Sequence, residues 1–470
     1  MTPAQVATKP DYSAPQLDAE TSKVDDTAQP PLLPGEHTLP ASWWVNENIF
    51  NLEKRAIFHN SWLYCTHSSR FTKPGDYHSF QVAGIKFFII KSRGDGGGGA
   101  HGSGESLKAF HNVCRHRAFP VVQKQSGSST VLTCKYHGWS YNSQGKLSNA
   151  PQFVDQVEGF NKSENSLYPI NIHTTQQGLV FINFNKDAEP FDDWFSGIST
   201  ELQEFDFGDY EYHMSYELFG DFNWKTLMDG YQECYHCPVA HPGLNSAFKM
   251  ETYKVVPKGR YCRHFATIVK EDEKQVVGEK QEEGSSSSWF GFGKKSSPKK
   301  EAAPAPTTQK KCNNKGGEFD GLWMYLFPNN GINCYSPAWY TIRVLPISAT
   351  KTTLQYDIYT KKGIDEASKK EFVDFLQQVE LEDFNLCQLT QENLNEGIYR
   401  SGFLHPQKEN GVLYYQKLVR DAVVKHLELE KELGKRIDPA AIAGSSKNKD
   451  LDELEGICQS SDCGDKEFDW

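Results

Sequence analysis

The stretch Cys114-Arg-His116, followed after seventeen residues by Cys134-Lys-Tyr-His137, determines how this chain is interpreted. It places one thiol and one imidazole on each of two short loops. Thiolates and imidazoles are side chains that hold zinc and iron in proteins. The pattern therefore predicts a metal centre built from two Cys and two His.

Two kinds of centre use this set of donors. A structural zinc site also binds two Cys and two His, but common zinc fingers pair Cys with Cys and His with His. In a Rieske [2Fe–2S] cluster, two Cys hold one iron and two His hold the other. We therefore expect a Rieske cluster, with zinc as the alternative. The expected ligands are Cys114, His116, Cys134 and His137. Imidazole ligands raise the cluster's potential, so that it can pass electrons to an oxygen-activating metal.

The composition fits a metalloenzyme better than a nucleic-acid-binding or membrane protein. The 470 residues are enough for two domains. The formal charge of −11 disfavours nucleic acid and anionic membranes, and no segment has the roughly 20 apolar residues that span a bilayer. The first 40 residues contain no Arg and no apolar signal core, and the eleven Cys are not expected to form a disulfide framework. We expect a cytoplasmic protein, with import into an organelle left open.

The chain divides into segments of different composition, and an α+β fold is expected. Short strands bounded by turns predict an antiparallel β domain in the first half, and the second half mixes strands with helices. The expected divisions are a disordered segment at 1–40, a Rieske [2Fe–2S] domain at 41–165, a catalytic domain at 166–437 with a low-complexity insertion at 270–317, and a polar tail at 438–470. Cys458 and Cys463 in the tail are expected to be free thiols.

A second metal site is predicted further along the chain. Glu233 and His236 are three residues apart, a spacing that places both on one face of a helix. Pro238 disturbs that helix, and His241 follows close enough to turn toward the same point. Two imidazoles and one carboxylate on one face of an iron form the facial triad of non-haem Fe(II) oxygenases, which leaves positions open for O2 and substrate. The alternative is a pair of core histidines.

The third ligand is expected to be a distant acid. Residues 365–397 show helical periodicity, with an apolar stripe formed by Phe372, Phe375, Leu376, Val379, Leu386 and Leu389. Asp383 lies between the positions of this stripe, and a carboxylate on a core-facing side is costly unless it is paired or binds a metal. Glu380 and Glu382 are the competing candidates, and the periodicity alone does not choose among the three.

These motifs resemble the large subunit of the Rieske non-haem iron oxygenases, and within it the branch of choline monooxygenase and other quaternary-amine oxygenases. The resemblance covers about residues 42–425. It implies a helix-grip catalytic domain with an antiparallel sheet after the Rieske domain, and a head-to-tail homotrimer. Its motifs are Asn112-Val-Cys-Arg-His-Arg117, Cys134-Lys-Tyr-His-Gly-Trp-Ser-Tyr141, Asn223-Trp-Lys225, Glu233-Cys-Tyr-His-Cys-Pro-Val-Ala-His241-Pro, Phe327-Pro-Asn329 and Glu382-Asp383.

The resemblance also implies a role for individual residues. Asp383 matches the acid among the three ligands of the mononuclear iron, beside His236 and His241. Glu233 matches the acidic residue that bridges a cluster His of one subunit, here His137, to an iron-ligand His of the next subunit, here His236. One departure is Asp229-Gly230, where the family usually has Glu-Asn upstream of the bridge.

The implied activity is a monooxygenase reaction on a small substrate with O2. A ferredoxin or an NAD(P)H-dependent reductase would supply the electrons, and choline is the expected substrate, oxidised to betaine aldehyde hydrate as in glycine betaine synthesis. Its trimethylammonium head would require aromatic faces. The candidate rings are Trp323, Tyr325, Phe327, Tyr335, Trp339 and Tyr340. The alternatives are a Rieske oxygenase acting on an aromatic or natural-product substrate, and a non-catalytic Rieske electron carrier.

Overall fold

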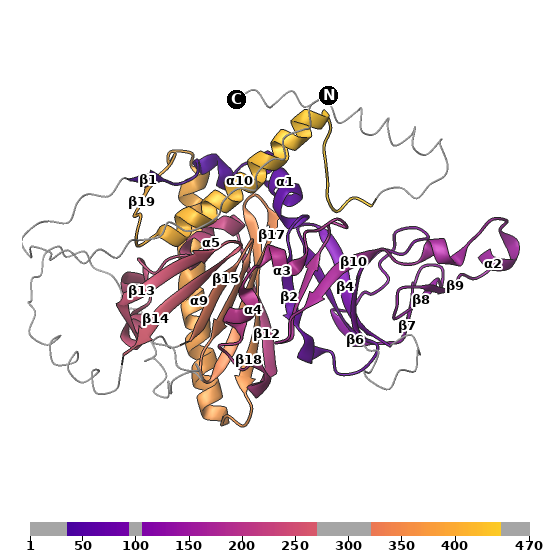
Figure 1. Cartoon of the computed structure of the whole chain (residues 1–470), viewed down its shortest axis with the longest axis horizontal. Coiled ribbons are helices and arrows are strands. Elements are labelled where there is room, and N and C mark those ends of the chain that lie inside the picture. The colour runs from indigo at the N-terminus through magenta and orange to yellow at the C-terminus, as the bar shows by residue number, and fades with distance from the viewer. Residues whose placement is uncertain (1–34, 94–105, 270–320, 443–470) are drawn as a thin grey trace, which may run out of the picture.

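A computed structural model describes residues 35–93, 106–269 and 321–442 of the chain (Figure 1). Most of the expected disordered segment, the 270–317 insertion and most of the polar tail, with Cys458 and Cys463, lie outside the described residues. Regular structure begins earlier than expected, because β1 (Glu36–His37) pairs with β19 (Phe403–Leu404). The first expected boundary, at residue 40, is therefore a few residues too late.

A seven-stranded antiparallel sheet forms the N-terminal half, in the order β2-β11-β10-β5-β4-β3-β6. Three short strands, in the order β7-β8-β9, form a separate sheet beside it. Because β10 pairs with β5 and β11 pairs with β2, the larger sheet extends past the boundary expected at residue 165. The strands are β2 (Leu63–His67), β3 (Asp76–Val82), β4 (Ile85–Ser92), β5 (Ser106–His111), β6 (Ser126–Ser128), β7 (Val131–Thr133), β8 (Ser140–Asn142), β9 (Leu147–Asn149), β10 (Pro169–Thr174) and β11 (Leu179–Asn183).

A second seven-stranded antiparallel sheet forms the C-terminal half, in the order β12-β18-β17-β16-β15-β14-β13. Its central strands are buried along almost their whole length, which explains their nearly continuous apolar and aromatic sequences. The strands are β12 (Tyr210–Gly220), β13 (Phe248–Lys258), β14 (Tyr261–Ile268), β15 (Leu322–Leu326), β16 (Asn330–Cys334), β17 (Ala338–Ser348) and β18 (Lys351–Lys361). Mixed helices and antiparallel sheets confirm the predicted α+β class.

Helices cover the C-terminal sheet and connect the two halves (Figure 1). The α-helices are α1 (Glu47–Glu53), α2 (Phe153–Gln156), α3 (Phe191–Trp194), α4 (Ile198–Leu202), α5 (Trp224–Tyr231), α6 (Cys237–Ala240), α7 (Pro242–Ala247), α9 (Glu366–Asn395) and α10 (Asn410–Leu433). The other short helices are η1 (Ala41–Trp44), η2 (Lys54–Phe58), η3 (Ser68–Arg70), η4 (Lys162–Asn165) and η5 (Phe207–Asp209). No helix in the described ranges combines the length and the apolar character needed to cross a membrane.

The long helix α9 matches the helix expected at 365–397. Asp365 caps its N-terminus by accepting a hydrogen bond from the Ser368 amide, at 2.9 Å. The predicted apolar stripe is correct only in the first half. Leu386 and Leu389 are 41% and 61% exposed, because the helix turns other residues, including Cys387, toward the core.

A buried ion pair attaches α5 to α1. The Lys225 ammonium lies 2.7 Å from Glu53 Oε1, and the Trp224 indole donates to Glu53 Oε2 at 2.8 Å. The side chains of Lys225 and Glu53 are both fully buried. The Asn223-Trp-Lys225 motif is thus structural, because it positions the helix that leads into the second metal site.

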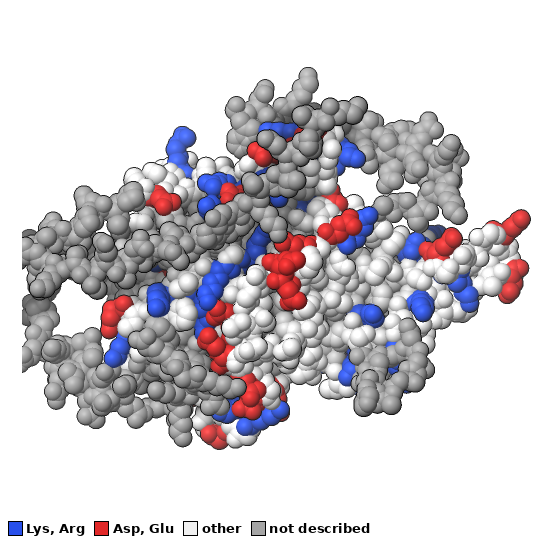
Figure 2. All heavy atoms as spheres, viewed as in Figure 1, with Lys and Arg blue, Asp and Glu red and all other residues white. Residues whose placement is uncertain are grey.

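Acidic and basic side chains lie side by side on the face of the molecule shown in Figure 2. A band of Lys and Arg near the centre of this view is flanked directly by Asp and Glu. Neither sign of charge dominates this face, in keeping with the modest net charge of the whole chain.

Candidate metal centres

The two cluster loops have the same backbone structure. In each loop, the amide of the Cys donates to the carbonyl five residues later, and the amide four residues later donates back to the Cys carbonyl, at 2.8 to 3.0 Å. These bonds require a positive φ at the fourth residue after each Cys. The φ angle is 56° at Ala118 and 78° at Gly138. Glycine adopts this conformation freely, whereas Ala118 pays roughly 1 to 2 kcal/mol for it. The fold thus presents Cys114 and Cys134 from matching turns.

The four predicted cluster ligands converge between these loops. The rings of His116 and His137 lie 4.5 Å apart, and Cys114 and Cys134 are both buried. Burial raises the pKa of the Cys134 thiol, and the neighbouring Cys114 thiol raises it further. His116 Nδ1 is buried with no hydrogen-bond partner among the described residues. An iron held by two thiolates and an iron held by two imidazoles would satisfy these groups, so the donors fit a Rieske cluster.

Two aromatic side chains support the cluster loops. The Tyr141 hydroxyl lies 3.3 Å from Cys114 Sγ and accepts a hydrogen bond from the Arg115 amide at 3.0 Å. Trp139 stacks on the His116 ring, with 5.0 Å between the centroids. Both residues belong to the Cys134–Tyr141 motif, so the second loop also holds the ligands of the first.

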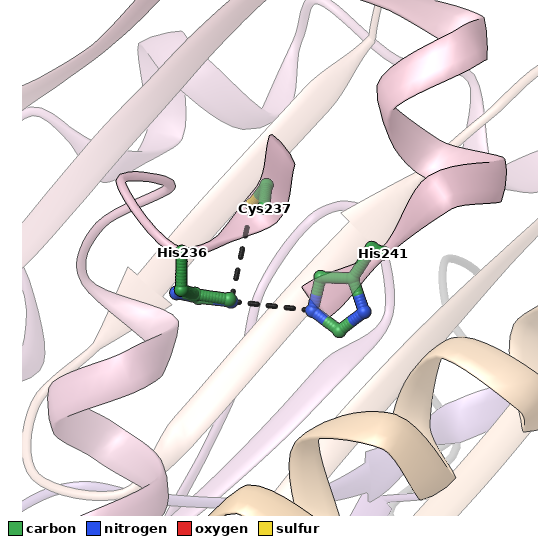
Figure 3. A group of neighbouring side chains, drawn as sticks. All are labelled: His236, Cys237 and His241. Atoms are coloured by element: carbon green, nitrogen blue, oxygen red, sulfur yellow. Dashed lines mark hydrogen bonds between the residues drawn. The ribbon is translucent and has the colours of Figure 1, made fainter. Parts of the chain in front are cut away.

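The predicted ligands of the mononuclear iron come together at a second point. His236 Nε2 lies 3.2 Å from His241 Nε2, and Asp383 Oδ1 lies 3.5 Å from the first nitrogen and 3.0 Å from the second. Three ligands at right angles around a metal, with bonds of about 2.1 Å, lie about 3.0 Å from one another. The three donor atoms therefore fit a facial triad. Figure 3 shows the two imidazoles directed toward each other.

The local structure of this site differs from the prediction. Glu233 and His236 do not lie on one face of a helix, because α5 ends at Tyr231 and α6 begins at Cys237. The residues between them form a loop in which the Glu233 carboxylate accepts a hydrogen bond from the His236 amide at 3.2 Å and contacts His236 Nδ1. Pro238 lies in the first turn of α6, where the missing amide hydrogen costs nothing. Glu233 and His236 therefore do interact as predicted, but they lie in a loop and not on a helix.

The two competing acids have other positions. Glu382 Oε2 lies 2.8 Å from His241 Nδ1, so it orients this imidazole from behind and leaves Nε2 for a metal. Glu380 is buried and accepts hydrogen bonds from the hydroxyls of Tyr340 and Tyr356, both at 2.8 Å. Burial and the nearby Asp383 carboxylate raise the pKa of Glu380 to about 7. Among the three acids, Asp383 is the one whose oxygen lies near both imidazoles.

Protons and a metal ion would compete for these imidazoles. Burial disfavours the charged form of His236, but its hydrogen bonds to Asp383 and Glu233 outweigh burial and raise its pKa to about 10. The surrounding carboxylates therefore favour positive charge at this point, and a divalent cation supplies it.

A disulfide joins Cys234 to Cys237, a pairing that the sequence did not predict. It encloses Tyr235 and His236 in a small loop. His236, Cys237 and His241 also form a group whose donor atoms lie within 4.8 Å of one another (Figure 3). Since the Cys237 sulfur is bonded to Cys234, the Asp383 carboxylate is the better third donor.

A cavity of about 130 Å³ opens beside the three candidate ligands. Trp323, Tyr335 and Tyr340, which were predicted to form an aromatic cage, line it. The other three predicted rings, those of Tyr325, Phe327 and Trp339, are not among the residues that line this cavity. Sequence reasoning missed Tyr231, Phe248 and Tyr253, which also line it, because they belong to other elements and only the packing of α5, β13 and the sheet brings them together.

A larger cavity, of about 840 Å³, also borders the candidate iron site, since Glu233, His236 and Asp383 line it. Gly230 lines both cavities, and a Cβ atom at this position would meet no atom within 4 Å. Gly230, which stands where the family usually has Asn, therefore leaves open space near the candidate ligands. A glycine within α5 lowers the stability of the helix by about 1 kcal/mol relative to alanine. Its neighbour Asp229 is half-buried, and the loss of solvent around its carboxyl raises its pKa to about 7, although a hydrogen bond from Gln416 opposes the shift.

Two family models match the chain. The Rieske [2Fe-2S] domain matches residues 61–161, and the catalytic domain of the ring hydroxylating alpha subunit matches residues 207–425. The first match contains the two cluster loops, and the second contains the three candidate ligands of the mononuclear iron.

Several of the similar proteins are named as monooxygenases of quaternary amines. The carnitine monooxygenase oxygenase subunit of Acinetobacter baumannii is 28% identical over 392 residues, which are 81% of this chain and 94% of the relative. Choline monooxygenase of Arabidopsis thaliana is 26% identical over 385 residues, 78% of each chain. A crystal structure of the quaternary ammonium Rieske monooxygenase CntA with L-carnitine has a TM-score of 0.65 and 25% identity, and the match covers 83% of this chain and 96% of that one.

The fold, the two sets of metal donors and these matches agree. The chain joins a Rieske [2Fe–2S] domain to the catalytic domain of a ring-hydroxylating alpha subunit, and it belongs to the Rieske non-haem iron oxygenases.

Proposed function

We propose that this chain is the oxygenase subunit of a monooxygenase that acts on a small trimethylammonium compound. The observation that carries the proposal is the cavity beside His236, His241 and Asp383. Aromatic rings and carboxylates line it, and none of its lining residues in the described chain is Lys or Arg. A cavity of this kind favours an organic cation whose nitrogen carries no hydrogen and so donates no hydrogen bonds.

The substrate class follows from the lining residues. A desolvated quaternary ammonium group gains about 2 kcal/mol over an aromatic face. The available rings are those of Tyr231, Phe248, Tyr253, Trp323, Tyr335 and Tyr340, and the acids are Glu233, Glu380 and Asp383. Choline, carnitine and glycine betaine, which appear in the names of the relatives, share this head group. Choline, expected from the sequence, is thus one member of the proposed class.

The reaction inserts one oxygen atom of O2 into a C–H bond of the substrate. Two electrons and two protons reduce the other oxygen atom to water. The mononuclear iron supplies O2 activation when it is bound. His236, His241 and Asp383 would hold it on one face, and Glu382 would keep the His241 ring oriented through its hydrogen bond to Nδ1. The apolar rings of the cavity limit the water that reaches the reacting carbon.

Electrons would arrive from another subunit. Figure 1 shows the strands next to the cluster loops, β7 to β9, on the opposite side of the chain from α9, which carries Asp383. A head-to-tail homotrimer would bring the cluster of one subunit to the iron of the next, and a ferredoxin or NAD(P)H-dependent reductase would reduce the cluster. Glu233, which contacts His236 Nδ1, would bridge the two centres.

A crystallised relative bears on this route. The structure of one such quaternary ammonium Rieske monooxygenase, 24% identical to this chain, gives insights into inter-subunit electron transfer in that protein.

The test is oxygen uptake by the purified protein with both metals bound and a reductase present. We expect choline, carnitine or glycine betaine to increase oxygen uptake and to yield an oxygenated product. Glu233→Gln should retain all iron yet lower turnover strongly, whereas the exposed control Glu211→Gln should keep the parent rate. A protein that binds only the two cluster irons would instead support a non-catalytic electron carrier. Uptake stimulated by aromatic compounds alone would support the ring-hydroxylating alternative.

A further inference from the structure

A row of three nitrogen donors crosses the floor of the cavity. In the register of the C-terminal sheet, His264 on β14 pairs with Trp323 on β15, and Trp323 pairs with Asn333 on β16. Directly opposite residues of antiparallel strands project from the same face of a sheet. The three side chains therefore stand next to one another, and all three line the cavity.

Each of these side chains is at least nine-tenths buried and has a nitrogen without a partner. The unpartnered atoms among the described residues include His264 Nε2, Trp323 Nε1 and Asn333 Nδ2. A buried donor that lacks an acceptor costs roughly 1 to 3 kcal/mol. Three such donors in one row are therefore expensive unless a ligand satisfies them.

The neighbours of the row determine that these atoms are donors. The indole nitrogen of Trp323 only donates. Asn333 Oδ1 accepts a hydrogen bond from the Tyr231 hydroxyl at 2.9 Å, which leaves the amide NH2 group free. His264 Nδ1 lies 2.8 Å from the Tyr253 hydroxyl, and this nitrogen is the one described acceptor in reach of that hydroxyl. When Tyr253 donates to Nδ1, the proton of the neutral ring is on Nε2.

His264 is a neutral ring at physiological pH. Burial lowers its pKa to about 3, and the adjacent Arg263 guanidinium contributes to the shift. The row thus presents N–H groups without a full positive charge.

The row matches a carboxylate better than a hydroxyl. The indole, the imidazole and the amide offer four hydrogens on three nitrogens, and a carboxylate has about four lone-pair sites on two oxygens. A hydroxyl has two lone pairs, and its own hydrogen would need an acceptor, which the row does not offer. The acids Glu233, Glu380 and Asp383 lie on the loop and the helix that face the sheet. The cavity is therefore acidic on one side and rich in donors on the other.

We infer that His264, Trp323 and Asn333 form a carboxylate-binding subsite that selects trimethylammonium substrates carrying a carboxylate over choline-like alcohols. The inference rests on the proposed function. It adds the group, a carboxylate, by which the protein would distinguish one trimethylammonium substrate from another. The donor row holds the carboxylate, and the ammonium end is oriented toward the aromatic rings and the candidate iron ligands.

The test compares three probes of equal chain length on the protein with its metals bound, under anaerobic conditions. The probes are 4-(trimethylammonio)butanoate, 4-(trimethylammonio)butan-1-ol and pentyltrimethylammonium. We expect calorimetry to show that the carboxylate probe binds at least about tenfold more tightly than the other two, because hydrogen bonds to a charged group are stronger than those to a neutral one.

Two variants test the row itself. Trp323→Phe keeps an aromatic ring but removes one donor, and it should reduce the carboxylate preference about tenfold without changing the affinity for pentyltrimethylammonium. Asn333→Asp should reverse the preference, because a carboxylate would then meet a carboxylate. The matched control is Trp339→Phe, since Trp339 is a buried Trp on β17 that does not line the cavity. Cluster absorbance and iron content confirm that each variant is folded.

The outcomes separate this inference from the proposed function. If all three probes bind the parent equally, or if both variants keep the parent's preference, the carboxylate subsite is wrong while the proposed substrate class stands. If none of the three probes binds to protein with both metals present, the proposed function and the subsite are both overturned.

Discussion

The buried ion pair between Lys225 and Glu53 gives the sharpest test of how the catalytic domain is assembled. We consider the change Lys225→Met, which keeps the length of the side chain and removes its charge. In the parent, Glu53 Oε1 lies 2.7 Å from the ammonium, and both side chains are completely buried. In the variant, the carboxylate keeps only the indole hydrogen bond of Trp224.

The size of the effect follows from this burial. Removing one partner of a buried ion pair destabilises a protein by about 3 to 5 kcal/mol, because the remaining charge is buried without compensation. For a domain of this size, each kcal/mol shifts the unfolding midpoint by about 2 to 4 °C. We therefore expect the midpoint to fall by about 6 to 20 °C. The double variant Lys225→Met, Glu53→Gln should recover more than half of the loss, since it leaves no buried charge.

Thermal unfolding followed by circular dichroism measures these shifts. The control is Lys351→Met, because Lys351 forms an exposed pair with Asp221 at 3.7 Å, and exposed pairs contribute about 0 to 1 kcal/mol. If Lys225→Met were no more damaging than Lys351→Met, the ion pair would not hold α5 in place. If the double variant were as unstable as the single one, the buried carboxylate would not be the cause.

Three further predictions concern residues at or near the two candidate metal centres. Because the pKa of Asp229 is raised to about 7, its protonated carboxyl adds to the free energy of unfolding, and this contribution is complete below the ordinary pKa of 3.8. The contribution is lost as the pH rises to about 7. The stability of Asp229→Asn relative to the parent should therefore increase by about 1.4 kcal/mol per pH unit between about pH 4.5 and 6.5 in urea denaturation, and a constant difference would refute this. Tyr141→Phe should lower the cluster potential by about 40 mV in a redox titration, since one hydrogen bond of about 1 kcal/mol to Cys114 is lost; an unchanged potential would contradict this role. His241→Ala should bind one iron fewer per chain while the paramagnetic resonance signal of the reduced cluster stays intact, whereas an unchanged iron count would remove His241 from the metal site.

The sequence alone was sufficient wherever the signal is local. The two cluster loops carry their ligands within a few residues, so the family and the cofactors could be predicted without a structure. The periodicity of residues 365–397 likewise predicted α9, because a helical pattern repeats over many turns. Local periodicity failed for Leu386 and Leu389, whose exposure depends on what packs against α9 rather than on their own spacing.

Tertiary structure decided the features that join distant segments. Residue spacing could not choose among Glu380, Glu382 and Asp383, because the choice depends on how α9 is rotated about its axis relative to a loop more than a hundred residues away. It also placed Glu233 and His236 on a helix, whereas the chain forms a loop there. The sheet register, which no local pattern encodes, brings His264, Trp323 and Asn333 into one row. Local patterns along the chain thus determined the metal chemistry, and packing across the chain determined the shape and polarity of the cavity where a substrate would bind.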